Sequence, residues 1–320
     1  MEPMYIHVAA HVLNSLWAVT PELREIMADV LAQRMAGDRL DAAEIEARIG
    51  AAQPAKVQRV RAGNVAIVPV HGMLTQRASL FSQVSGMTSL EQVAAQYDDA
   101  LNDAKVDTVV LHMNTPGGST DGIPELAARI RAGRDHKRIV AVADTLSASG
   151  GYWLGSQAHE FSVTMSGSAG SIGVYSLHRD LSKRLEQDGV DVTMFSAGDF
   201  KTEGNPFGPL SDDAKEAIQE RVNDMYDLFV DDVAAGRGVA SDSVRGGFGR
   251  GRTLNARRAL EAGMVDRIET FDQALARHRT APPPRRQPSP PPDRAVARRQ
   301  TARARQSAGL LLSALPRSRG

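Results

Sequence analysis

Two spacings of hydrophobic residues alternate along the chain from residue 64 onward. Short runs rich in Val and Ile predict buried strands, and apolar residues three and four positions apart predict amphipathic helices. Strands are predicted at 65–70, 106–113, 138–143, 161–165 and 190–195, and helices at 89–103, 121–133, from 149, 177–187 and 210–236. A short helix leading into a terminal strand is predicted within 255–265. This alternation favours βαβ units and a mostly parallel sheet, so the predicted fold class is α/β.

The residues before 64 show a different pattern. Apolar positions at helical spacing predict a helix at 20–36, which Thr20 can cap and Pro21 can begin, and a second short helix at 41–49. We therefore expect an N-terminal helical segment and connector at 1–60, a folded domain at 61–275 and a tail at 276–320.

Charge is distributed unevenly, although the net charge of the 320 residues is zero. Residues 281–320 hold nine arginines, one acidic residue and eight of the sixteen prolines. The remaining residues carry 29 basic and 37 acidic side chains, a net charge of about −8. Such a composition predicts a disordered, basic and proline-rich tail. Weak contact between this tail and nucleic acid is the alternative that its arginines allow.

Several classes of site are excluded or disfavoured by composition. The chain has no cysteine, which excludes disulfides and thiolate metal sites. Its eight histidines are scattered and show no His-x-His spacing, and only His7 and His11 are four residues apart, so we expect no metal and no cofactor. No apolar stretch approaches the roughly 18–20 residues of a membrane span, and no signal peptide is evident at the N-terminus. We therefore expect a cytoplasmic protein without a membrane span.

Asn114-Thr115-Pro116-Gly117-Gly118 follows the predicted strand 106–113 directly. Glycines at the carboxyl end of a buried strand leave backbone N–H groups free to point into a cleft. Gly117 is therefore a candidate donor in an oxyanion hole, which stabilises a developing alkoxide. An ordinary strand-to-helix turn would have the same composition.

A serine in a small-residue turn lies between a predicted strand and a predicted helix, in Leu146-Ser147-Ala148-Ser149-Gly150-Gly151-Tyr152. This place favours an exposed Oγ beside a helix N-terminus, so Ser149 is a candidate nucleophile and the Gly150 N–H a second oxyanion donor. Ser147 is the rival nucleophile, and either serine could simply cap the helix. A Ser-His-Asp triad through His112 or His178 is a further alternative.

Lys201 is a candidate general base, because only six of the 38 basic side chains are lysines and arginine does not give up its proton. A lysine base needs its pKa lowered by burial, which Phe200, Pro206 and Phe207 could provide. Ser171, in the small-residue run 167–174, could orient the lysine amine. A solvated surface lysine and a tightly packed small-residue loop are the alternatives.

The four segments together, in this order, resemble the signal peptide peptidase family of Ser/Lys proteases, which includes phage and prophage head-maturation (capsid-assembly) proteases. The residues that match are Asn114–Gly118, Ala148–Tyr152, Gly170–Val174, Lys201 with Asn205–Phe207, Arg258–Leu260 and Gly263–Asp266. The resemblance implies a ClpP/crotonase-like fold of repeated ββα units. It also implies a serine endopeptidase in which Ser149 is the nucleophile, Lys201 the general base and Ser171 the residue that orients Lys201, with Gly117 and Gly150 as oxyanion donors.

Within this family the chain resembles the phage type, because a membrane anchor is not evident and residues 13–19 (Leu-Asn-Ser-Leu-Trp-Ala-Val) are similar to that type. The resemblance implies a homo-oligomeric ring whose neighbouring protomers complete each active site. It also implies scaffold or capsid proteins as substrates, association with the portal or capsid, and a location in the host cytoplasm or assembling prohead. Two alternatives are a bacterial signal peptide peptidase-like protease that degrades residual peptides and a catalytically inactive structural shell component.

Overall fold

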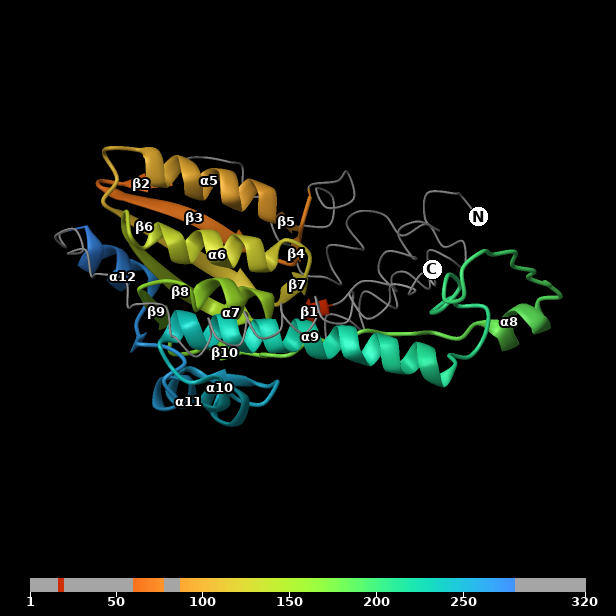
Figure 1. Cartoon of the computed structure of the whole chain (residues 1–320). Coiled ribbons are helices and arrows are strands. Elements are labelled where there is room, and N and C mark those ends of the chain that lie inside the picture. Colours follow the sequence, from red (N-terminus) through yellow and green to blue (C-terminus); the bar gives the residue numbers. More distant parts are fainter. Residues whose placement is uncertain (1–16, 20–59, 78–86, 280–320) are drawn as a thin grey trace, which may run out of the picture. The chain divides into compact units, whose positions relative to one another are not determined.

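The computed structural model describes residues 17–19, 60–77 and 87–279. Figure 1 shows helices layered against strands in this part of the chain. The helices are α5 (Leu90–Asn102), α6 (Ile123–Gly133), α7 (Gly150–Gly155), α8 (Ser182–Gln187), α9 (Asp212–Arg237), α10 (Ser241–Gly247), α11 (Ala256–Glu261) and α12 (Phe271–His278). The strands are β1 (Trp17–Val19), β2 (Val60–Ala62), β3 (Val65–His71), β4 (Leu74–Thr75), β5 (Thr88–Ser89), β6 (Thr108–Thr115), β7 (Gly117–Ser119), β8 (Arg138–Ala148), β9 (Glu160–Val163), β10 (Ser168–Gly170), β11 (Thr253–Asn255) and β12 (Arg267–Ile268).

The described strands form two sheets. The larger has the order β11-β10-β8-β6-β3-β2, and β9 pairs with β8 and with β12. Its centre is parallel, since β3, β6 and β8 run in one direction. The smaller sheet has the order β1-β7-β4-β5. Twice a long strand of the large sheet is followed by a short strand of the small sheet and then a helix, as β3–β4–α5, with β5 leading into the helix, and as β6–β7–α6. The α/β prediction is confirmed, and these two units have the predicted ββα form.

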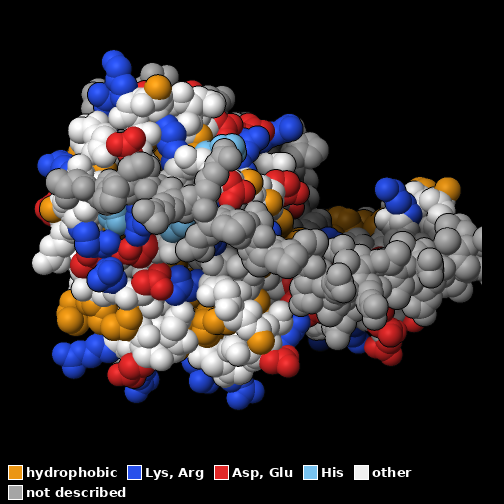
Figure 2. All heavy atoms as spheres, turned by 60° about the vertical axis from the view of Figure 1, so that its left-hand side comes forward, with side chains coloured by type: hydrophobic (Ala, Val, Ile, Leu, Met, Phe, Trp, Pro, Cys, Tyr) orange, Lys and Arg blue, Asp and Glu red, His pale blue; other side chains and the backbone are white. Residues whose placement is uncertain are grey.

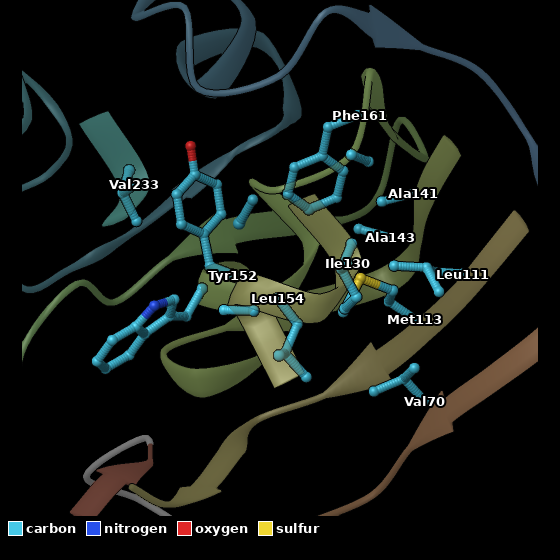
Figure 3. Close-up of a cluster of buried hydrophobic side chains, with 14 of the residues drawn as sticks. Val70, Leu111, Met113, Ile130, Ala141, Ala143, Tyr152, Leu154, Phe161 and Val233 are labelled. Carbon is cyan, nitrogen blue, oxygen red and sulfur yellow. The ribbon is translucent and has the colours of Figure 1, made fainter. Parts of the chain in front are cut away.

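The core lies on both faces of the large sheet, because successive side chains of a strand point to opposite faces. Along β6, Val109, Leu111 and Met113 belong to the larger hydrophobic cluster, together with side chains of α5, α6, α7 and α9. Val110 belongs instead to a second cluster with Leu275 of α12. Figure 3 shows part of the larger cluster. Covering the sheet on both faces in this way fixes the carboxyl ends of its parallel strands.

Glu160 centres an ion-pair network that joins the C-terminal helix α12 to β9. Its carboxylate accepts hydrogen bonds from Arg138 at 3.1 Å and from Arg267 at 3.1 Å. Arg277 of α12 also bonds to Glu160, and reaches Glu269 as well. On the face shown in Figure 2, basic and acidic side chains lie interspersed. A single-sign field of the kind that binds nucleic acid is therefore not seen on that face.

Two sequence expectations about the folded part are wrong. Residues 190–195 form no strand, because Val190, Val192, Met194 and Phe195 are exposed and no neighbouring strand pairs with them. The helix expected at 177–187 begins only at residue 182. In the N-terminal segment, Trp17–Val19 form a strand, although a helical segment was expected there. The helices predicted at 20–36 and 41–49, and the tail from residue 280, lie outside the described residues. The domain boundaries stay predictions.

Candidate active site

Ser149 lies where β8 ends and α7 begins. Its φ is 54° and its ψ is −119°, a backbone conformation that is unfavourable for a residue with a Cβ atom. Its N–H donates to the Gly170 carbonyl at 2.6 Å, and its carbonyl accepts from Trp153 at 2.9 Å. The residue is only 1% exposed, and its Oγ has no hydrogen-bond partner among the described residues. The fold therefore holds a buried, unpartnered hydroxyl in a strained conformation.

Helix α7, which follows Ser149, is anchored by its large side chains. The Tyr152 hydroxyl donates to the Met264 carbonyl at 2.8 Å. The Trp153 indole N–H donates to Asp232 at 2.9 Å, and its ring stacks on Phe229 with centroids 4.2 Å apart. Figure 3 shows Tyr152 among the buried side chains of the core. These contacts explain how a short helix holds the serine in place.

The two glycines after Ser149 have different functions in the structure. A Cβ atom on Gly151 would lie 2.4 Å from Thr115 Cγ2, so only glycine allows α7 to approach β6 this closely. Gly150 is the first residue of α7. The first N–H groups of a helix have no acceptor within the helix, which leaves Gly150 suitable as a donor to an oxyanion. This role stays a prediction.

Gly117, the other predicted oxyanion donor, begins β7 with a φ of 97°. Its N–H donates to Thr115 Oγ1 at 3.1 Å, and Thr115 Oγ1 donates in turn to the Gly72 carbonyl at 2.6 Å. The Gly117 N–H is thus already engaged, and an oxyanion would have to share it. The sequence analysis assigned no role to Thr115, although the residue lies within the motif at 114–118. A hydroxyl two residues before the predicted donor was the available signal.

Ser171 follows β10 directly and, like Ser149, has a positive φ, of 56°. Its N–H donates to the Arg252 carbonyl at 3.0 Å. The preceding residue, Gly170, accepts the Ser149 N–H and pairs with Ala148 across β10 and β8. The structure therefore places Ser149 and Ser171 at the ends of adjoining parallel strands.

Lys201 forms no hydrogen bond with Ser149 within the described chain. Ser149 Oγ has no hydrogen-bond partner in the described chain, and no hydrogen bond there joins Lys201 to Ser171. The lysine lies in a turn, where its N–H donates to the Gly198 carbonyl at 3.2 Å. Phe200 is 67% exposed, so the burial expected from this side chain is not provided. The described chain therefore does not form a Ser149–Lys201 hydrogen bond.

The histidine alternative does not include Ser149 either. His112 Nε2 lies 3.0 Å from Asp144 Oδ2, with the edge of the His71 ring nearby, and His178 contacts a backbone carbonyl. Burial, and then the neighbouring His112, lowers the pKa of His71 to about 4. Of this cluster, only His112 is a candidate from the sequence. Among the described residues, no group of three or more His, Asp or Glu side chains could hold a metal ion. No helix within 17–19, 60–77 and 87–279 has the length and hydrophobicity of a membrane span.

Comparison with known proteins relates this site to a peptidase family. Residues 131–281 match the model of Peptidase family S49. The capsid assembly protease C of Escherichia phage lambda is 29% identical over 86% of this chain and 65% of its own length. The head-tail preconnector protein of Enterobacteria phage P21 is 31% identical over 72% of this chain and 46% of its own length. The chain thus spans less than two thirds of either relative.

Among solved structures, a ClpP1 variant from Listeria monocytogenes matches with a TM-score of 0.40 and 13% identity over 65% of this chain and 94% of that chain. The family match includes the segments that carry Ser149, Ser171 and Lys201. This part of the chain is therefore similar to peptidase family S49, and the two phage proteins are its relatives.

Proposed function

We propose that this protein is a serine endopeptidase that uses a Ser/Lys dyad. The observation that supports the proposal best is the state of Ser149, whose strained backbone holds a buried Oγ without a partner. Strained conformations of this kind are typical of catalytic positions, where the surrounding structure stabilises them. The match to peptidase family S49 supports the same assignment.

In the proposed mechanism, the neutral Lys201 amine takes the proton from Ser149 Oγ as that oxygen attacks a peptide carbonyl. The N–H groups of Gly117 and Gly150 stabilise the resulting oxyanion. The protonated amine then gives its proton to the leaving nitrogen, and water hydrolyses the acyl-enzyme in a second cycle of the same transfers. Ser171 orients the lysine amine throughout.

Because Lys201 forms no hydrogen bond with Ser149 within the described chain, we propose that a neighbouring protomer of a homo-oligomeric ring supplies the lysine. Several exposed apolar side chains close to Lys201 in the sequence support this interface. Phe195 is 94% exposed and Phe200 67%, and Met194 and Phe207 are exposed as well. Exposed apolar surface, where it is contiguous, typically marks an interface with another protein.

The biological role that we propose is head maturation in a phage or prophage, with scaffold or capsid proteins as substrates. This places the protein in the host cytoplasm or the assembling prohead, associated with the capsid or portal. The two phage relatives support this role. A signal peptide peptidase is the second candidate, because a putative signal peptide peptidase of Enterococcus faecium is 31% identical over 64% of the chain. Co-expression with neighbouring capsid proteins, followed by mass spectrometry of the cleavage products, distinguishes the two roles.

The dyad is tested with two matched pairs of variants. We expect Ser149→Ala and Lys201→Arg each to lower proteolysis at least about 10³-fold, because arginine keeps the charge but cannot act as the base. Ser147→Ala, two residues from the nucleophile, and Lys183→Arg, an exposed lysine of α8, serve as controls that should retain activity. Undiminished proteolysis by Ser149→Ala would refute the assignment. A wild-type protein without proteolytic activity that behaves as a structural shell component would refute it as well.

The assembly of the dyad is tested by co-expressing Ser149→Ala with Lys201→Ala. If a head-to-tail interface brings the two residues together from different protomers, about a quarter of the sites in randomly mixed rings would hold both residues. The mixture should then regain activity that neither variant has alone. A mixture as inactive as the separate variants would show that the dyad forms within one chain.

A further inference from the structure

The strand β1 pairs with β7, the strand that begins at the candidate oxyanion donor Gly117. The two strands are antiparallel, with Trp17 opposite Ser119, Ala18 opposite Gly118 and Val19 opposite Gly117. Figure 1 shows β1 beside β7. A segment almost one hundred residues earlier in the sequence thus lies along the backbone of the candidate site.

Strand β7 has both of its edges occupied as a result. On one edge Leu74 of β4 pairs with Gly118 in parallel, and β1 takes the other edge. Gly118 and Leu74 are so close that a Cβ atom on the glycine would lie 1.9 Å from the Leu74 carbonyl oxygen. The β7 edge that faces β4 is therefore closed to another strand. The opposite edge, which β1 occupies, could accept another strand if β1 were displaced.

The position of β7 gives this edge its importance. It packs against α7, the helix that Ser149 begins. A peptide substrate in extended form binds by adding a strand to a free sheet edge, since main-chain hydrogen bonds then hold it independently of its sequence. In the observed register, the residue opposite Gly117 is the one beside the candidate oxyanion donor, and here that residue is Val19.

We infer that β1 is an intramolecular occupant of the edge where an extended peptide substrate binds, so that the N-terminal strand inhibits the enzyme until it is displaced. The inference rests on the proposed function of Ser149. It predicts that Trp17–Val19 and a substrate peptide compete for the same backbone groups of β7. A site that is free only part of the time binds with an affinity reduced by that fraction.

The first test weakens β1 and measures how fast Ser149 is labelled by two probes. Ala18→Pro removes a backbone N–H from the strand, whereas Ala18→Val keeps it and is the control. A tripeptidyl phosphonate needs the β7 edge, and a small fluorophosphonate does not. We expect Ala18→Pro to be labelled about tenfold faster by the peptidyl probe, the gain for an edge that is free about a tenth of the time. The fluorophosphonate rate and both rates of Ala18→Val should match the wild type. Equal peptidyl rates in all three proteins would overturn the inference.

The second test locks β1 in place, and it does not depend on the first variant folding. The chain has no cysteine, so Trp17→Cys with Ser119→Cys creates a single possible disulfide between two residues that lie opposite each other. The oxidised protein should be labelled by the peptidyl probe at least about tenfold more slowly than the same protein after reduction. Equal rates before and after reduction would contradict the inference.

A third measurement separates this inference from the proposed function. Hydrogen exchange is measured at Gly117–Ser119 in the Ser149→Ala background, with and without Ala18→Pro. We expect exchange at β7 to be at least about fivefold faster with Ala18→Pro, and exchange at 109–111 in the core to stay unchanged. If neither probe labels Ser149 while β7 exchange responds as expected, the peptidase assignment fails and the β1 cover stands. If β7 exchange does not respond, the inference fails.

Discussion

Replacing Ser149 by alanine and by glycine should reveal the strain that the active site stores. A residue held at φ 54° and ψ −119° costs about 1–3 kcal/mol, and alanine keeps that cost while glycine removes it. Glycine lowers the free energy of unfolding by about 0.5–1 kcal/mol through its greater freedom in the unfolded chain, so Ser149→Gly should be more stable than Ser149→Ala by about 1 kcal/mol. Ser149→Ala should itself be more stable than the wild type by about 1 kcal/mol, because the buried Oγ lacks a partner. Stability is therefore predicted to increase from the wild type to Ser149→Ala and then to Ser149→Gly.

The assay is thermal and urea unfolding at one fixed protein concentration, which is needed because self-association shifts apparent stability. For a folded unit of this size, about 1 kcal/mol corresponds to about 2–4 °C in Tm. Ser147 is the matched control, since it is buried in β8 at a position without positive φ. There glycine should be less stable than alanine by about 0.5–1 kcal/mol. If Ser149→Gly were also less stable than Ser149→Ala, the argument from strain would be refuted.

Two further predictions concern the supports of the site. Burial alone would raise the pKa of Glu160, but the neighbouring His278, whose Nε2 lies 3.9 Å from the carboxylate, and the hydrogen bonds from Arg277 hold that pKa well below its ordinary value of 4.5. The network's stabilisation is therefore complete above pH 4.5 and is lost as the pH falls further, so the urea midpoint of Glu160→Gln should vary less with pH in this range than that of the wild type. Identical pH profiles would contradict this. Gly151→Ala should cost about 1–3 kcal/mol by forcing α7 away from Thr115 Cγ2, and should lower peptide hydrolysis. Adding Thr115→Ser, which removes that methyl group, should restore part of the stability and part of the hydrolysis. A double variant as impaired as Gly151→Ala would exclude the steric explanation.

The parts of the fold that follow from local sequence were predicted well. The helices predicted at 89–103 and 210–236 are observed as α5 and α9, and the side chains of Ser89 and Ser211 cap them. The strand expected at 190–195 failed because Val190, Val192 and Met194 alternate as in a strand, yet pairing depends on a distant neighbour. Strand β1 was missed for the same reason, because its partner β7 lies far along the chain.

In the candidate site as well, local sequence predicts some features, and others depend on contacts between distant segments. The place of Ser149 between β8 and α7 follows from a strand pattern that ends before a small-residue turn. Its link to Gly170 and the engagement of Gly117 by Thr115 depend on how strands adjoin, which a single sequence does not specify. The lack of a Ser149–Lys201 hydrogen bond in the described chain has the same origin, because the contacts that would bury the lysine are not local.

The proposed mechanism depends on Ser149 as the nucleophile and on Lys201 as the base that activates it. The most direct measurement is the rate of labelling by a fluorophosphonate, followed by mass spectrometry of the modified peptide, in the wild type and in Lys201→Arg. The account predicts one adduct, on Ser149, in the wild type and labelling at least about 10²-fold slower in Lys201→Arg. An adduct on Ser147 instead, or undiminished labelling in Lys201→Arg, would contradict it.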